Sequence, residues 1–184
     1  MAGINRALQE NRTTAKAAAD LNRPCIFLSH IYVDKAAALA IGEYITQRGY
    51  IDIYLDVHDR DLQVAVSNGD PHGITTFIER GLYLSTHIMC IISNHTANSW
   101  WVPYELGFAK SEGKHISSLK LKDVTLPAYL EISEIVRGTD SLNRFLTRIR
   151  NGLTKSASVV SLTESLLRSN MSNHPLDPYL DWQE

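Results

Sequence analysis

The feature that most constrains this chain is a regular alternation of short apolar runs with segments of helical spacing. The apolar runs are CIFLS (25–29), IDIYL (51–55) and HIMCIIS (87–93), and the helical segments between them are 34–48 and 73–85. Near-continuous apolar strands separated by helices indicate a parallel sheet that is covered by helices on both faces. We therefore expect an α/β fold with right-handed crossovers.

The remaining segments extend this pattern. SWWVPYELGFAKSEG (99–113) is expected to be a helix and KHISSL (114–119) a fourth strand. The polar stretch 56–72 carries an Asn-Gly-Asp-Pro turn signal and is expected to be a long loop, while Gly49 is expected to stop helix 34–48. Further helices are expected over LPAYLEISEIV (126–136), SLNRFLTRIRNGL (141–153) and VVSLTESLLRS (159–169).

A single domain with appendages accounts for the length of 184 residues. We expect a weak, Ala-rich helical appendage over 1–22, the domain over 23–155, and a helix followed by a tail over 156–184. No structure is assigned to the tail itself, NHPLDPYLDWQE, which contains two prolines.

Composition excludes several classes of partner. The net charge of −2 gives no electrostatic reason to expect nucleic acid or an anionic membrane surface, and the cluster Arg144, Arg148 and Arg150 is interpreted as the solvated face of a helix. Cys25 and Cys90 lie in apolar runs and are expected to be buried, reduced thiols. There is no secretory h-region and no stretch of membrane-spanning length, so we expect a cytoplasmic protein.

The common motifs of catalytic α/β proteins are missing. No Gly-x-Gly-x-x-Gly follows the first strand, and no Gly-Lys-Ser/Thr loop or Gly-x-Ser-x-Gly elbow occurs. The seven histidines do not show metal-ligand spacing. A dinucleotide dehydrogenase, an NTPase, a Ser-His-Asp hydrolase and a metal site are therefore not expected.

Polar residues follow the expected strands at their carboxyl ends, where ligands bind in open parallel sheets. Ser29 and His30 end the first strand, Asp56 ends the second, and Ser93 ends the third, whose loop leads into the helix that carries Glu105. These groups are expected to meet at one edge of the sheet.

Glu105 has two interpretations at this stage. Asn98 or Ser99 can cap its helix, and Trp101 lies one turn earlier on the same side. The helix N-terminus favours an ionised carboxylate, and the aromatic neighbour would shield that group from water. Acidic residues are also common near helix starts for purely structural reasons, so the pattern alone leaves a structural and a functional carboxylate equally open.

Four segments along the sequence are CIFLSH, YLD, ERGLYLSTHIMCIIS and SWWVPYELGFA. They occur in the order and spacing of a bacterial Toll/interleukin-1 receptor (TIR) domain, which the chain resembles from about Cys25 to Arg150. The last of them fits the family's Ser-x-Trp-x-x-x-Glu signature. The resemblance implies a flavodoxin-like fold with strand order 2-1-3-4-5. For many bacterial members it also implies cleavage of the nicotinamide–ribose bond of NAD+.

The resemblance assigns site residues. Glu105 takes the position of the family's catalytic glutamate, and Ser99 and Trp101 take the other signature positions. Ser29, His30, Asp56 and His58 match positions that line the family's nucleotide site. Many members carry Arg or Lys after the first-strand Ser, whereas this chain has Ser-His-Ile-Tyr, so the groups that contact the phosphates are not identified.

A single carboxylate agrees with this chemistry. Glycosidases generally use two because the leaving oxygen must be protonated, whereas the pyridinium of NAD+ departs as neutral nicotinamide. One carboxylate can stabilise or trap the oxocarbenium-like C1′. Water then gives ADP-ribose, and an internal nucleophile gives a cyclic isomer, with no metal or further cofactor.

Three hypotheses follow. The first is an NAD+-cleaving or cyclising enzyme that resembles the stand-alone TIR component of anti-phage systems such as Thoeris, which self-associates and whose product is bound by a separate effector. The second is a scaffold TIR domain in which Glu105 is structural. The third is an enzyme similar to nucleoside deoxyribosyltransferases. Retention of Glu105 and Trp101 in their sequence context favours the first.

Overall fold

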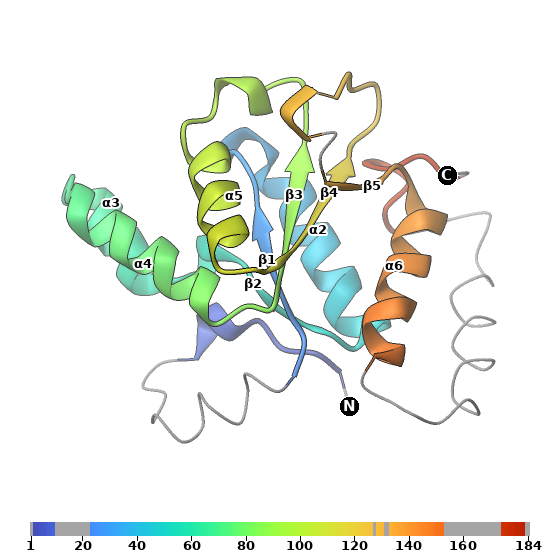
Figure 1. Ribbon diagram of the computed structural model, residues 1–184, viewed down its shortest axis with the longest axis horizontal. Coiled ribbons are helices and arrows are strands. Elements are labelled where there is room, and N and C mark those ends of the chain that lie inside the picture. Colours follow the sequence, from blue (N-terminus) through green and yellow to red (C-terminus); the bar gives the residue numbers. More distant parts are fainter. Residues whose placement is uncertain (1, 10–22, 127, 131–132, 153–173, 183–184) are drawn as a thin grey trace.

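The centre of the protein is a five-stranded parallel sheet. The structure is a computed structural model that describes residues 2–9, 23–126, 128–130, 133–152 and 174–182. Its strands are β1 (Cys25–Ser29), β2 (Asp52–Tyr54), β3 (His87–Ile92), β4 (His115–Lys120) and β5 (Glu134–Val136). Their order is β2-β1-β3-β4-β5 and all pairs are parallel, which confirms the α/β class and the flavodoxin-like order 2-1-3-4-5 (Figure 1).

Helices cover both faces of the sheet (Figure 1). One face carries α4 (Pro71–Tyr83) and α5 (Trp101–Ser111), and the other carries α2 (Lys35–Tyr44) and α6 (Thr139–Asn151). Short turns link them: η1 (Arg6–Leu8), η2 (Tyr32–Asp34), η3 (Ile45–Gly49), η4 (Asp56–His58), η5 (Thr96–Asn98) and η6 (Ala128–Leu130). None of the helices in the described ranges is long and apolar enough to cross a membrane.

Each strand contributes to two cores because successive side chains point to opposite faces. In β1, Ile26 and Leu28 join the core under α2 and α6, while Cys25 and Phe27 join the core under α4 and α5. The apolar runs had to be continuous for this reason. Cys25 and Cys90 are buried, reduced thiols, as expected.

The prediction of a long loop over 56–72 is wrong. Residues Arg60–Ser67 form helix α3, which packs against α4 in a hairpin that projects from the body of the molecule (Figure 1). Only Leu62 and Ala65 of α3 are buried. The sequence of this segment is therefore mostly polar, which is why it was predicted to be a loop. The turn signal is correct, since Gly69 adopts a φ of 63° and Asp70 caps α4.

Two further predictions are wrong. Segment 126–136 is not a helix, because Glu134–Val136 form β5 on the edge of β4. Helix 34–48 changes to a π turn after Tyr44, and the left-handed residue that ends it is Tyr50, with a φ of 55°, rather than Gly49. The helix expected over 141–153 is present as α6.

The described terminal residues pack on the domain. Residue Asn5 makes a parallel bridge to Ile53 of β2, where the beginning of an α-helix was expected. In the tail, Leu176 and Leu180 are buried in the core of α2 and α6. The expected helix over 159–169 and the region 10–22 lie outside the described residues, and the division at residues 22 and 155 remains a prediction.

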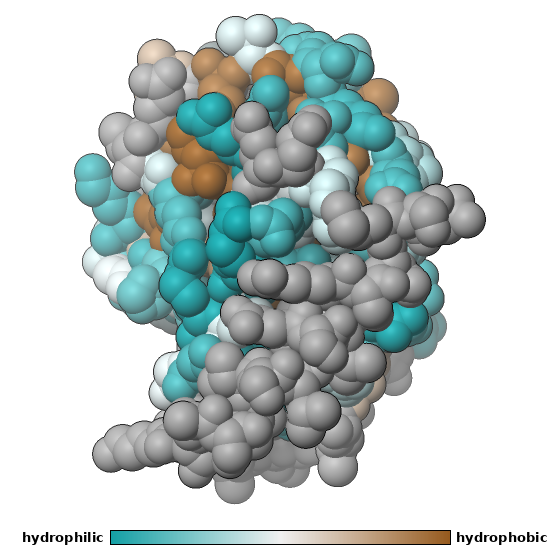
Figure 2. Space-filling model, turned by 90° about the vertical axis from the view of Figure 1, so that its right-hand side faces the viewer, coloured by the Kyte–Doolittle hydropathy of each residue, from teal (hydrophilic) through white to brown (hydrophobic). Residues whose placement is uncertain are grey.

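The basic cluster on α6 is solvated and paired. Arg144 contacts Asp140, Arg148 contacts Glu134, and Arg150 lies over the ring of Tyr50. Among the coloured residues of Figure 2, hydrophilic side chains predominate on the face that includes this helix. Carboxylate partners and solvation agree with the interpretation of this cluster as a helix surface.

Candidate active site

The helix that carries Glu105, α5, is fixed by a cap at its N-terminus and by an apolar face that packs on the core. Ser99 Oγ accepts a hydrogen bond of 3.2 Å from the backbone N–H of Val102, so Ser99 caps the first turn, as one of the two expected candidates. Val102 and Ala109 are fully buried and Leu106 packs beside them, so these residues form the core face of α5. Glu105 is 4% exposed, so its carboxyl group belongs to the interior.

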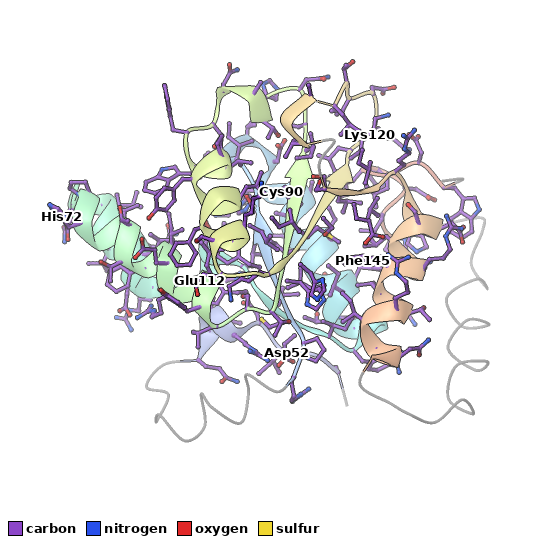
Figure 3. The ribbon with its side chains drawn as sticks, viewed as in Figure 1. Asp52, His72, Cys90, Glu112, Lys120 and Phe145 are labelled. Carbon is purple, nitrogen blue, oxygen red and sulfur yellow. The ribbon has the colours of Figure 1, made fainter. Side chains whose placement is uncertain are left out.

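Beneath α5, β1 supplies Ser29 at its carboxyl end and β3 supplies Cys90. The two residues are partners in the parallel register of β1 and β3. Cys90 lies in the core between the sheet and α5 (Figure 3), and Ser29 shares that face with Phe27 because strand residues alternate. Burial raises the pKa of the Cys90 thiol well above its usual range, and the charge of Glu105 adds to this increase. Glu105, Cys90 and Ser29 are therefore electrostatic neighbours.

The helix N-terminus was expected to keep Glu105 ionised, but the structure does not agree with this expectation. Burial raises the pKa of its carboxyl group to about 8, the Ser29 hydroxyl acts in the opposite direction, and the charge of Asp56 adds to the increase. The loss of hydration exceeds the influence of the helix dipole because the side chain is almost completely enclosed. A carboxyl group with this pKa is mainly protonated at neutral pH until a positive charge comes near.

Asp56 and His30 form the second part of the site. His30 Nδ1 lies 3.6 Å from Asp56 Oδ1, and the His30 side chain is 4% exposed. Burial raises the pKa of Asp56, and the charge of His30 opposes this increase. His30 Nδ1 also donates to the backbone oxygen of Leu28 over 3.2 Å, and because a carbonyl oxygen can only accept, this nitrogen carries the proton.

Unsatisfied buried oxygens concentrate at this edge of the sheet. Six buried side-chain oxygens have no hydrogen-bond partner within the described residues, and three of them are Ser29 Oγ, Asp56 Oδ1 and Glu105 Oε2. A fourth, Asp34 Oδ2, belongs to the turn that follows β1. Such atoms are rare in native proteins and require an explanation, which a polar ligand at this edge would provide.

The other predicted residues lie farther from this group or have other contacts. His58 is exposed, and its Nδ1 lies 2.9 Å from the side-chain amide of Asn5. The Trp101 ring is 38% exposed and contacts the ring of Tyr104 edge to face. Trp100, which has no predicted role, is 92% exposed.

Sequence reasoning missed two neighbours of the site. Cys90 was interpreted only as a buried thiol, although it is two residues from both Ile88 and Ile92 and therefore shares their face of the strand, which lies under α5. Asn5 lies in the region interpreted as an appendage, and no local signal links it to η4.

A cavity of about 640 Å³ lies at the opposite edge of the sheet, near the amino ends of the strands. Its lining includes the stacked rings of His87 and His115, and Phe145. Burial and the neighbouring His115 lower the pKa of His87 to about 4, so the His87 ring is neutral at neutral pH. Within the part of the chain that is described, no group of three or more His, Cys, Asp or Glu residues could hold a metal ion.

Comparison with protein-family models matches residues 27–125 to the TIR-like domain of the Thoeris protein ThsB. The matched region covers more than half of the chain and contains the end of β1 together with β2, β3, α5 and β4. The chain belongs to this family. It is thus a TIR protein of the Thoeris anti-phage defence type, and its strand order agrees with a TIR fold. A comparison with curated proteins gave no match.

Proposed function

We propose that this Thoeris TIR protein cleaves the nicotinamide–ribose bond of NAD+ and that Glu105 is the catalytic residue. The observation that carries the proposal is a buried, protonatable carboxyl group beside unsatisfied oxygens at the ligand edge of the sheet. Perturbed carboxyl groups of this kind cluster at functional sites.

The substrate itself supplies the charge that this site needs. Nicotinamide in NAD+ is a cationic pyridinium, and its approach would favour release of the Glu105 proton, since a nearby positive charge lowers the pKa of a carboxyl group. The resulting carboxylate faces the ribose C1′ in an enclosed site, where its electrostatic effect is strongest.

The reaction balances with one carboxylate. The C1′–N bond breaks, its electron pair returns to the pyridinium nitrogen, and neutral nicotinamide leaves without protonation. Glu105 stabilises the oxocarbenium-like C1′ until an oxygen or nitrogen nucleophile forms the new bond and releases its proton to solvent. Water gives ADP-ribose, and a nucleophile of the nucleotide itself gives a cyclic isomer. This route requires no metal and no further cofactor.

The product would act as a signal. We propose that a cyclic ADP-ribose isomer passes to a separate nucleotide-sensing effector protein, and that the TIR protein self-associates to become active. The Thoeris family match supports this arrangement.

The test is mass spectrometry of the products formed from NAD+ by the wild type and by Glu105→Gln. The amide is nearly isosteric but cannot become negative, so nicotinamide release should fall by about 10²–10³-fold or more. Glu112→Gln is the matched control, because Glu112 is an exposed residue at the end of the same helix (Figure 3).

The wild type and Glu112→Gln should release nicotinamide at equal rates. Equal rates for Glu105→Gln as well would show that Glu105 is structural and would favour a scaffold function. Circular dichroism and size-exclusion profiles would establish that the fold is intact in both variants.

A further inference from the structure

The described N-terminal residues are tied to the edge strand β2 by a buried ion pair. Arg6 is 2% exposed, and its Nη2 lies 3.0 Å from Asp52 Oδ2 (Figure 3 labels Asp52). Arg6 also donates to the backbone oxygens of Leu84 and Arg23. A guanidinium with this many partners fixes its backbone firmly, and Asn5 is the next residue.

The orientation of the Asn5 side chain follows from its contacts. Its Oδ1 accepts hydrogen bonds from the backbone N–H groups of Ala7, at 3.1 Å, and Leu55, at 3.2 Å. Both partners can only donate, so the other end of the amide must be the NH₂ group. That NH₂ group lies 2.9 Å from His58 Nδ1.

This contact decides the tautomer of His58. An amide NH₂ group can only donate, so His58 Nδ1 must accept, and the single proton of the neutral ring therefore lies on Nε2. His30 has the opposite tautomer, because its Nδ1 donates to the Leu28 oxygen. Asn5 thus makes His58 a fixed Nε2–H donor on an exposed ring, within η4 and two residues after Asp56.

We propose that Asn5 is a positioning residue that holds His58 as an Nε2–H donor to the pyrophosphate of the dinucleotide substrate. This inference rests on the proposed NAD+-cleaving function. It provides a phosphate contact for a chain that lacks both a glycine-rich phosphate loop and an Arg or Lys directly after Ser29. Asn5 lies outside the residues 27–125 that match the family, so this part of the substrate site would come from the N-terminal segment rather than from the matched region.

The tautomer can be measured in the free protein by nitrogen-15 NMR of the histidine rings. We expect the Nε2–H form for His58 in the wild type. In Asn5→Asp, the two backbone N–H groups keep an acceptor, but a carboxylate oxygen now faces Nδ1, so the neutral ring should carry its proton on Nδ1. A wild-type His58 with the proton on Nδ1, or with mixed tautomers, would overturn the inference without any assay of activity.

Binding is tested with ADP-ribose, which contains the pyrophosphate, and with adenosine, which does not. His58→Asn keeps an amide at the position of Nδ1 but has no donor at the position of Nε2, whereas the longer side chain of His58→Gln can place a donor there. We expect ADP-ribose to bind about tenfold more weakly to His58→Asn. Affinity should largely return in His58→Gln, and adenosine affinity should be unchanged in both. His72→Asn, at the tip of the α3–α4 hairpin, is the control (Figure 3).

The link to Asn5 requires a double-mutant comparison. Asn5→Ala should weaken ADP-ribose binding in the wild type and have no further effect in His58→Asn, since its influence acts through that ring. Equal ADP-ribose affinity of His58→Asn and the wild type, or no binding of ADP-ribose to the wild type, would overturn the inference. If ADP-ribose binds through His58 but the wild type does not cleave NAD+, the proposed function fails and the assignment of His58 stands.

Discussion

At the residue scale, the carboxyl group of Glu105 is ionisable and buried, so the stability of the fold should depend on its protonation. Burial raises its pKa from the ordinary 4.5 to about 8. Between these values the folded protein binds a proton that the unfolded chain has released. Because the unfolded state then binds fewer protons, the free energy of unfolding should decrease as the pH rises through this range.

Glu105→Gln removes this pH-dependent cost. We expect the variant to be more stable than the wild type by roughly 4–5 kcal/mol above about pH 8, and the difference to disappear below about pH 4. Urea unfolding of both proteins across this range would measure it. Burial lowers the pKa of His87 and His174, so both proteins also become more stable as the pH rises through the acidic part of this range. Only the difference in stability between the two proteins therefore reports on Glu105. A constant difference would contradict the raised pKa.

The same pKa should appear in the kinetics if Glu105 acts as a carboxylate. The value of kcat/KM for NAD+ should rise with pH and level off above an apparent pKa of about 8, which is that of the free enzyme. The pKa seen in kcat should be lower, because the bound pyridinium favours the carboxylate. Initial rates of nicotinamide release across this pH range would test both statements. A rate that falls as Glu105 ionises would exclude the proposed role.

At the scale of elements, two helical glycines should respond in opposite ways to the same substitution. A Cβ on Gly81 of α4 would lie 2.4 Å from Tyr54 Cε1, whereas a Cβ on Gly107 of α5 would meet no atom within 4 Å. Alanine favours a helix over glycine by about 1 kcal/mol, but overpacking against a buried ring costs about 1–3 kcal/mol. Gly107→Ala should therefore raise the melting temperature and Gly81→Ala should lower it. Thermal unfolding by circular dichroism measures both, and a more stable Gly81→Ala would contradict the close packing of α4 on β2.

The α3–α4 hairpin is attached to β2 by a buried carboxylate. Asp59 is 2% exposed and caps α3. It accepts a hydrogen bond from the Tyr54 hydroxyl and two 3.0 Å hydrogen bonds from Arg80. Arg80→Met leaves this charge with fewer partners. We expect a loss of about 2 kcal/mol, below the value for a fully buried pair because Arg80 is partly exposed. In Arg144→Met, which breaks an exposed pair with Asp140 on α6, the expected loss is below about 0.5 kcal/mol. Urea unfolding compares the two, and equal losses would show that the Asp59 network does not anchor the hairpin.

At the scale of the whole molecule, the ligand edge of the sheet carries exposed aromatic rings. Trp100 is 92% exposed at the start of α5, and Tyr32 is 82% exposed in the turn after β1. Large exposed apolar side chains next to a site are typical of interaction surfaces. They agree with self-association as part of the proposed function.

If self-association completes the active state, specific activity should rise steeply with protein concentration. Trp100→Ser should reduce this dependence, while Tyr50→Ser, in the turn between η3 and β2, should leave it unchanged. Nicotinamide release and light scattering over a wide range of concentrations provide the measurement. A specific activity independent of concentration for the wild type would contradict the proposal.

The elements that could be predicted from the sequence are those with many buried residues. The strands β1, β2 and β3 and helix α5 were found because their apolar residues are continuous or periodic. Helix α3 was missed because only Leu62 and Ala65 are buried. Strand β5 was missed because its three residues, Glu134–Val136, gain their structure from pairing with β4, which no local pattern encodes.

The sequence by itself determined the parallel α/β architecture, the family resemblance and the position of Glu105 at the ligand edge, because all three depend on the order and periodicity of residues along the chain. Only the tertiary structure decided that Glu105 is enclosed rather than held ionised by its helix, that Ser29 and Asp56 influence its proton, and that Asn5 reaches His58. Burial and contacts between distant segments set these properties, and they exist only once the chain has folded.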